Sequence, residues 1–285
     1  TNDKQKNNED FNYVVDTFAD MQILRYQVPA LETLSVKQKE LIYYLTEAAL
    51  YGRDILYDQN GKYNLLVRRT LEAIYKNYEG DKNSADFRAF EIYLKRVWVS
   101  NGIHHHYGND KFVPEFSLTF FETEINKLPT ADFEQIGMSA QDLLQTLTPI
   151  IFDPQVAPRR LVQDSGVDLL QASACNYYEG VSQVEAEQFY NTQKDPNNAT
   201  PISYGLNSKL IKENGIVTEK TYKIGGLYSA AIKQIVYWLE KAFSVAENEQ
   251  QKSVIRKLID YYRTGNLRTF DEYSIAWVND TASHI

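Results

Sequence analysis

The sequence YSAAIKQIVYWLEKAFSVAE, residues 228–247, sets the fold class of this chain. Apolar side chains recur in it at intervals of three and four residues, which places them on one face of a helix. They are Ala231, Ile235, Trp238, Leu239 and Phe243. Residues 250–264 repeat the spacing with Val254, Leu258, Ile259 and Tyr262. The pattern predicts two long amphipathic helices in the last third of the chain.

Helical spacing extends over most of the remaining sequence. It predicts helices over residues 11–26, 35–56, 63–78, 87–100, 116–128, 139–147, 182–190 and 269–280. Ser182 and Glu185 have the spacing of a capping box at a helix start. Residues 209–218 instead predict a β-hairpin, because Asn214-Gly215 supplies the positive φ angles of a two-residue turn. We expect a mainly α chain with a small β element, an α+β fold.

Charge and composition exclude two classes of partner. Thirty basic against thirty-eight acidic residues give a net charge of −8. Nucleic-acid binding needs a clustered positive face, whereas basic residues here occur at most in pairs, so we expect no nucleic acid. We interpret Arg68-Arg69 and Arg159-Arg160 as solvated faces of helices or loops. No run approaches the roughly 18 apolar residues of a bilayer-crossing helix, so we expect no membrane span.

The single cysteine, Cys175, excludes an internal disulfide framework and a cysteine-based zinc site. We interpret it as a small packed hydrophobe rather than a nucleophile. A nucleophilic cysteine needs a histidine base close in space, and nothing in the sequence brings one to Cys175.

The two ends of the chain carry different signals. Residues 1–10 are almost wholly polar and predict a disordered tail, which leaves residues 11–285 as the structured part. Residues 270–285 form an amphipathic run without a closing glycine, proline or charged cap, so we expect a truncation at residue 285. No signal peptide remains. We expect a cytoplasmic location or, after removal of a signal, a periplasmic or exported one.

Three of the four histidines stand together in NGIHHHYGNDKFVP, residues 101–114. This segment follows the helix predicted over residues 87–100, and binding groups collect on loops that rigid elements carry. We therefore take it as the candidate site. Adjacent histidines cannot point together, so we interpret His104, His105 and His106 as supporting or surface residues and expect little effect from His105→Ala.

Several segments carry a family resemblance. They are QKELIYYLTEAA (38–49), residues 98–114 with GNDKFVP at their end, SACNYY (173–178), SYGLNS (203–208) and residues 271–285. The chain resembles the N-terminal part of dipeptidyl peptidase III, a family of zinc-dependent exopeptidases, and specifically its bacterial members. The resemblance covers nearly the whole chain from about residue 20 onward.

This resemblance implies a two-lobed protein with a wide cleft. One lobe is built on a small β-barrel with helices, and this chain would contribute chiefly to that lobe; the other is mostly helical and holds the zinc. In the family, an extended peptide adds as a strand to a sheet edge in the cleft. Zinc activates a water, a glutamate takes its proton, and dipeptides leave from the peptide N-terminus.

The sequence departs from the family where the metal binds. The family's zinc ligands belong to a His-Glu-x-x-x-His helix and a later glutamate-bearing helix, and neither occurs here. We therefore assign no catalytic residue and no metal ligand, expect zinc only in the parent enzyme, and expect this segment alone to be inactive. The resemblance assigns one substrate-binding residue, Tyr107, the aromatic position before Gly-x-x-Lys-Phe. Phe112 of the same motif is assigned to the core.

Two functions from different classes remain open. In the first, which the resemblance implies, the chain would be the N-terminal portion of a zinc dipeptidyl aminopeptidase, a hydrolase, and would form scaffold and part of the substrate cleft. Alternatively it is a stand-alone helical module that binds peptides or proteins without cleaving them. The expected partners are an oligopeptide substrate and the remainder of the same polypeptide, in a monomer.

Overall fold

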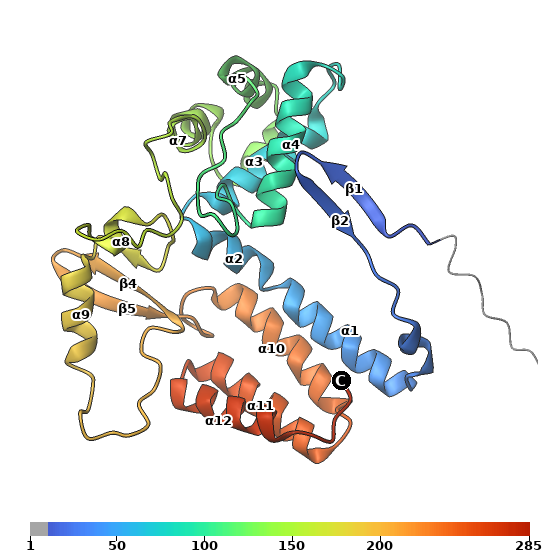
Figure 1. The fold of residues 1–285 in the computed structure, drawn as a ribbon, viewed down its shortest axis with the longest axis vertical. Helices are drawn as coiled ribbons and strands as arrows, with labels where there is room; N and C mark the ends of the chain where they lie inside the picture. The colour runs from blue at the N-terminus through green and yellow to red at the C-terminus, as the bar shows by residue number, and fades with distance from the viewer. Residues whose placement is uncertain (1–10) are drawn as a thin grey trace, which may run out of the picture. The chain divides into compact units, whose positions relative to one another are not determined.

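The structure is a computed structural model that describes residues 11–285. The predicted polar tail, residues 1–10, lies outside the described residues. The chain divides into two compact units, Thr1–Ser35 and Val36–Ile285, each of which has its own internal contacts (Figure 1).

The described part of the first unit forms a β-hairpin. Strand β1 (Val14–Phe18) pairs antiparallel with β2 (Met21–Leu24), and the 3₁₀-helix η2 (Pro29–Thr33) follows. The helix predicted over residues 11–26 is therefore wrong. Its apolar positions fit a helical period, but the β-branched residues of β1 favour a pleated strand. Ala19, with a φ of 48°, turns the chain back directly after that strand.

The second unit is mainly helical, with one small sheet (Figure 1). Its helices are α1 (Val36–Leu50), α2 (Arg53–Asn60), α3 (Asn64–Asn77), α4 (Ala85–Ser100), α5 (Leu118–Asn126), α6 (Thr130–Ile136), α7 (Ala140–Phe152), α8 (Leu169–Ala172), α9 (Gln183–Asn191), α10 (Ser229–Ser244), α11 (Glu249–Thr264) and α12 (Leu267–Asn279). Its strands are β3 (Tyr178–Glu179), β4 (Ser208–Glu213) and β5 (Ile216–Thr221). The predicted α+β class is confirmed. None of the helices in the described part of the chain has the length and apolar character needed to cross a bilayer.

The boundaries differ from the predicted ones at several places. The helix predicted over residues 35–56 is divided into α1 and α2 at Tyr51-Gly52, because glycine is a poor helix former. Helix α2 continues to Asn60, past the predicted helix end at residue 56. Helix α6, bounded by Pro129 and Gly137, was not predicted at all.

Two local predictions are confirmed. Strands β4 and β5 form the expected hairpin, with Asn214 and Gly215 at φ angles of 51° and 80°. The capping box of α9 is present, since Ser182 Oγ accepts from the Glu185 N–H and the Glu185 carboxylate accepts from the Ser182 N–H. Strand β3 pairs parallel with β4, which gives the sheet order β3-β4-β5.

The second unit has three separate clusters of buried apolar side chains. One joins α2, α3, α4, α5 and α7 and contains the fully buried Phe90 and Phe121. A second joins α1, α10 and α11 through Leu41, Ile232 and Ile259, and α1 and α10 pack side by side (Figure 1). A small third cluster lies between α9 and the sheet. Each cluster follows the apolar stripe of its helices.

A hydrogen-bonded polar chain joins the elements between these clusters. Tyr228 Oη, at the start of α10, donates to Asp58 Oδ2 of α2 at 2.6 Å, and Asn176 Nδ2 donates to the same oxygen at 3.3 Å. Lys209 of β4 is 9% exposed, and its Nζ donates to Asn176 Oδ1 at 2.7 Å. A buried ammonium is tolerated only when it is paired, so Lys209 needs a carboxylate beside it.

Glu179 of β3 is that carboxylate. It accepts from Lys209 Nζ at 2.5 Å and, with its other oxygen, from Lys62 Nζ at 2.6 Å. These hydrogen bonds, the one from Lys209 first, lower the pKa of Glu179 from 4.5 to about 2. The ionised form of Glu179 is therefore favoured in the folded chain.

The lowered pKa of Glu179 predicts a pH-dependent stability. A carboxyl whose folded pKa is depressed contributes stability above its unfolded pKa, and that contribution is lost as the pH falls to the folded value. The free energy of unfolding of the purified chain should therefore decrease between pH 4.5 and about 2. Glu179→Gln should flatten this decrease. Glu213→Gln, a change at an exposed carboxyl of β4, is the matched control and should leave it in place; equal slopes for both variants would contradict the assignment.

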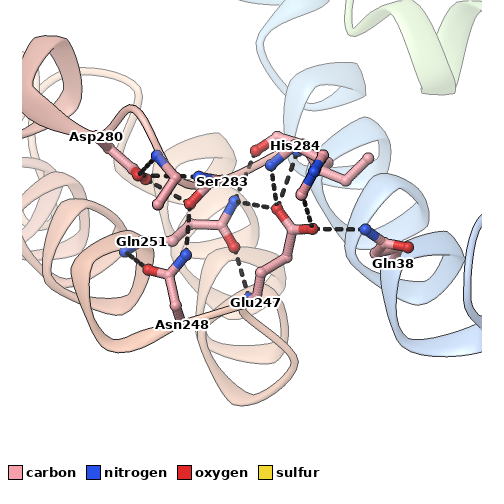
Figure 2. Close-up of polar contacts among 9 residues, drawn as sticks. Gln38, Glu247, Asn248, Gln251, Asp280, Ser283 and His284 are labelled. Atoms are coloured by element: carbon pink, nitrogen blue, oxygen red, sulfur yellow. Dashed lines mark hydrogen bonds and ion pairs between the residues drawn. The ribbon is translucent and has the colours of Figure 1, made fainter.

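A second carboxylate, Glu247, holds residues 284 and 285 (Figure 2). Its Oε2 accepts from the backbone N–H groups of His284 at 2.6 Å and Ile285 at 3.0 Å, and its Oε1 accepts from Gln38 Nε2 of α1 at 2.6 Å. Gln251 Nε2 donates to the carbonyl oxygen of Ile285 at 2.6 Å. Burial opposes ionisation of Glu247, but the hydrogen bonds prevail and lower its pKa. Glu247 thereby fixes this segment beside α1 and α11.

Candidate functional site: the loop of residues 101–114

The entry to the loop is fixed by the end of α4. Asn101 ends the helix in the left-handed region at a φ of 51°. Gly102 follows at a φ of 150°, and a Cβ there would lie 2.2 Å from Asn64 Nδ2 of α3, so only glycine fits. The Asn64 side chain then accepts from the Ile103 N–H at 3.2 Å. The loop therefore leaves the helical core at a defined place and angle.

Residues 103–112 fold back on themselves. The Phe112 N–H donates to the Ile103 carbonyl at 2.8 Å, and the His105 N–H donates to the Asp110 carbonyl at 2.8 Å. The Asn109 N–H donates to the His105 carbonyl at 3.0 Å, which closes the tip. Asn109 has a φ of 63°, a conformation that asparagine tolerates better than most residues.

A second segment, residues 158–160, lies alongside the loop. The Lys111 N–H donates to the Pro158 carbonyl at 3.0 Å, and the Arg160 N–H donates to the Asn109 carbonyl at 2.9 Å. On its other side, the Arg159 and Arg160 carbonyls accept from Ala174 and Cys175. Backbone hydrogen bonds therefore join three segments of the chain, residues 103–112, 158–160 and 174–175.

The Arg160 guanidinium holds the tip of the loop. It donates from Nε and Nη2 to Asn109 Oδ1, each at 3.1 Å, and from Nη2 to the His106 carbonyl at 3.2 Å. Its Nη1 reaches Asn60 Oδ1 of α2 at 3.4 Å. The interpretation of Arg159-Arg160 as a solvated pair is therefore wrong for Arg160. It holds for Arg159, whose partly exposed side chain pairs with Asp110 at 3.1 Å. No local sequence signal marks Arg160, because the acceptors lie about 50 and 100 residues away.

The three histidines point to different places. His104 is buried, and its Nε2 donates to the Ala157 carbonyl at 2.8 Å. Burial lowers the pKa of His104, so this ring stays neutral. His105 Nδ1 accepts from backbone N–H groups of its own loop. His106 Nδ1 lies 3.3 Å from Ser100 Oγ, and its ring stacks on that of His105.

These side chains do not fit the zinc that the resemblance implies. Among residues 11–285, no three His, Cys, Asp or Glu side chains come together as a metal ion would require. A catalytic zinc needs three protein ligands in a fixed arrangement, whereas the three histidine rings face different groups, namely the Ala157 carbonyl, the amides of the loop tip and Ser100. We assign no catalytic step to them.

Tyr107, the predicted substrate-binding residue, stands at the tip. Its side chain is 83% exposed, and its ring packs against that of His106 with 4.5 Å between centroids. Phe112 is 7% exposed and packs in the core of α2, α3, α4, α5 and α7, as predicted. The loop therefore presents one aromatic ring outward and anchors another inward.

Cys175 lines a cavity beside the base of the loop. The cavity has a volume of about 380 Å³, and Asn60, Arg160 and Tyr177 also line it. Burial raises the pKa of the Cys175 thiol. Since the thiolate is the nucleophilic form, this environment favours the predicted packing role over a catalytic one.

A larger cavity, about 650 Å³, lies between α9 and the loop of residues 194–204. Its wall combines apolar and aromatic side chains, including Leu170 and Tyr190, with polar ones such as Glu187 and Asn191. Two of its hydroxyl groups bond protein partners, since Tyr190 Oη donates to Glu219 and Tyr204 Oη donates to the Gln193 carbonyl.

Comparisons with known proteins agree on one family. The model of peptidase family M49 matches residues 173–285. Dipeptidyl peptidase 3 from Homo sapiens is 22% identical over 290 residues, and the protein of the same name from Rattus norvegicus is 21% identical. The chain resembles dipeptidyl peptidase III. The resemblance inferred from the sequence is thus confirmed.

A solved structure of DPP III from Caldithrix abyssi shows the likeness in fold. It matches 88% of this chain with a TM-score of 0.53 at 13% sequence identity. The chain spans only part of its relatives, 38% of both dipeptidyl peptidase 3 sequences and 35% of the Caldithrix chain. The α+β fold of this chain therefore resembles part of the dipeptidyl peptidase III structure.

The contacts of Arg160 predict that its removal lowers the stability of the chain more than the removal of its neighbour Arg159. Arg160→Ala removes a charged donor from two half-buried acceptors, Asn109 Oδ1 and the His106 carbonyl, which should cost about 2 kcal/mol of unfolding free energy. Arg159→Ala removes an exposed ion pair and should cost less than about 1 kcal/mol. Chemical denaturation of both variants measures the difference; equal losses would show that Arg160 does not hold the loop.

Proposed function

We propose that this chain is the N-terminal portion of a zinc-dependent dipeptidyl aminopeptidase. The match to peptidase family M49 over residues 173–285 carries this proposal. The dipeptidyl peptidase 3 relatives, which align over 88% of the chain and 38% of their own length, support the view that it is part of a longer enzyme.

In this proposal the chain supplies scaffold and one wall of the substrate cleft, and the zinc site belongs to sequence after residue 285. Tyr107 contacts the peptide. Two observations support this contact: the Tyr107 ring is exposed, and several hydrogen bonds fix the loop beneath it. A phenol offers a flat apolar face together with a hydroxyl, which suits a peptide of varied sequence.

The substrate is an oligopeptide, from which the whole enzyme removes N-terminal dipeptides, and the other partner is the remainder of the polypeptide. The enzyme acts as a cytoplasmic monomer, or in the periplasm if an N-terminal signal has been removed. The competing function, a helical module that binds peptides without cleaving them, gives a different result in the first experiment below.

The proposal predicts that zinc binding and peptidase activity require the longer protein. The 285-residue chain should bind no stoichiometric zinc and should release nothing from a dipeptidyl arylamide, because residues 11–285 contain no three convergent ligands. The full-length protein should contain one zinc and cleave. Elemental analysis and arylamide release on both proteins test this. Zinc and turnover in the short chain would contradict the proposal, and a full-length protein that binds peptides without zinc would favour the binding module.

The role of Tyr107 predicts a loss of activity without a loss of stability. In the full-length enzyme, Tyr107→Ala removes an aromatic contact, which should cost about 1–3 kcal/mol in transition-state binding, or ten- to a hundredfold in kcat/KM. Tyr107→Phe keeps the flat ring and should be milder. Zinc content and Tm should barely change, because the ring is not in the core.

Tyr237→Ala provides the matched control, since Tyr237 is an exposed tyrosine on α10 outside this loop. It should leave kcat/KM unchanged. If Tyr107→Ala instead lowers Tm by several degrees and leaves kcat/KM intact, Tyr107 is a packing residue and makes no substrate contact.

A further inference from the structure

The backbone at Tyr107 is bonded to the side chain of a neighbouring residue. The Tyr107 N–H donates to His105 Nδ1 at 3.1 Å, and the Gly108 N–H donates to the same nitrogen at 3.0 Å. Side-chain acceptors that take up the N–H groups two and three residues later are a known way to fix a turn. Asparagine and aspartate usually provide them; here an imidazole does.

This arrangement defines the state of the His105 ring. An imidazole accepts at Nδ1 only when that nitrogen carries no proton, so the neutral ring bears its proton on Nε2. The backbone of His105 also belongs to the loop ladder, through its N–H to the Asp110 carbonyl and its carbonyl to the Asn109 N–H. Side chain and backbone of one residue thus fix the whole tip from His105 to Asp110.

The His105 ring is itself held in place. It lies edge-on to the buried Phe112 ring with 6.1 Å between centroids, and it stacks on His106 at 4.7 Å with 18° between planes. The half-buried imidazole therefore bridges from the core side of the loop to the Tyr107 N–H. Because these contacts fix the His105 ring, its Nδ1 can in turn fix the backbone of Tyr107 and Gly108.

We propose that His105 is a positioning residue for Tyr107: its Nδ1 fixes the Tyr107-Gly108 backbone and so directs the phenol ring outward. The peptide contact of that ring rests on the proposed function. His105 was expected to have a minor supporting or surface role; its two backbone bonds give it a larger one.

Two substitutions separate the acceptor from the ring. His105→Phe keeps an aromatic ring against Phe112 and His106 but removes the acceptor. His105→Asn keeps an acceptor oxygen close to the Nδ1 position but removes the ring. His106→Phe is the matched control on the adjacent histidine, whose Nδ1 lies by Ser100 rather than by the tip amides.

Two measurements apply to each variant. Amide hydrogen exchange by NMR on the 285-residue chain reports the Tyr107 and Gly108 N–H groups, and kcat/KM of the full-length enzyme on a dipeptidyl arylamide reports peptide contact. For His105→Phe we expect both amides to exchange at least about tenfold faster and kcat/KM to fall about fivefold, with zinc content unchanged. His105→Asn and His106→Phe should stay close to the original protein in both readouts.

Unchanged exchange of both amides in His105→Phe would overturn the proposal, as would equal effects of His105→Phe and His105→Asn. Faster exchange with an unchanged kcat/KM would also overturn it, and Tyr107→Ala then locates the fault. If Tyr107→Ala still lowers kcat/KM, the contact stands and only the role of His105 falls; if it does not, the proposed contact of Tyr107 is wrong.

Discussion

The hydrogen bonds of Arg160 are the constraint on which the candidate site depends. One guanidinium reaches the tip of the loop at Asn109 and His106, and α2 at Asn60. Arginine suits this place because its planar fork offers several donors in fixed directions, which a lysine ammonium does not. Without it, backbone hydrogen bonds would still pair residues 103–112 with each other and with residues 158–160, but the tip would lose its link to α2 at Asn60.

Hydrogen-bonded polar side chains also join separate elements elsewhere in the second unit. Its apolar side chains form three clusters rather than one, and polar residues with exact partners join the elements between them. Lys209 with Asn176 and Glu179 is one such junction, and Glu247 with Gln38 and residues 284–285 joins elements within the cluster of α1, α10 and α11. Buried polar groups are costly unless they are fully paired, but when paired they specify one arrangement. The second unit thereby gains defined junctions between packed layers.

Local sequence patterns predicted what depends on neighbours in the chain. The two long helices of the last third, the Asn214-Gly215 hairpin and the Ser182 capping box need only periodicity and turn chemistry, and all are confirmed. The helix expected over residues 11–26 failed because its apolar spacing fits two periods, and β-branched residues with a turn at Ala19 decide for strands. Long-range contacts could not be predicted, because nothing near Arg160 or Lys209 in the sequence reveals acceptors 30 to 100 residues away. The loop of residues 101–114 was found as a candidate, but the separate tasks of its three histidines were not.

In the proposed enzyme, this chain contributes shape rather than reacting groups. Its loop offers an exposed aromatic ring on a backbone fixed from several directions, and none of its described residues forms a metal site. The most direct test of this account is a structure of the full-length protein with a non-hydrolysable oligopeptide bound. The account predicts the Tyr107 ring in van der Waals contact with the peptide, at about 4 Å, while residues 103–112 keep their backbone ladder. A peptide bound elsewhere, with Tyr107 facing open water, would contradict it.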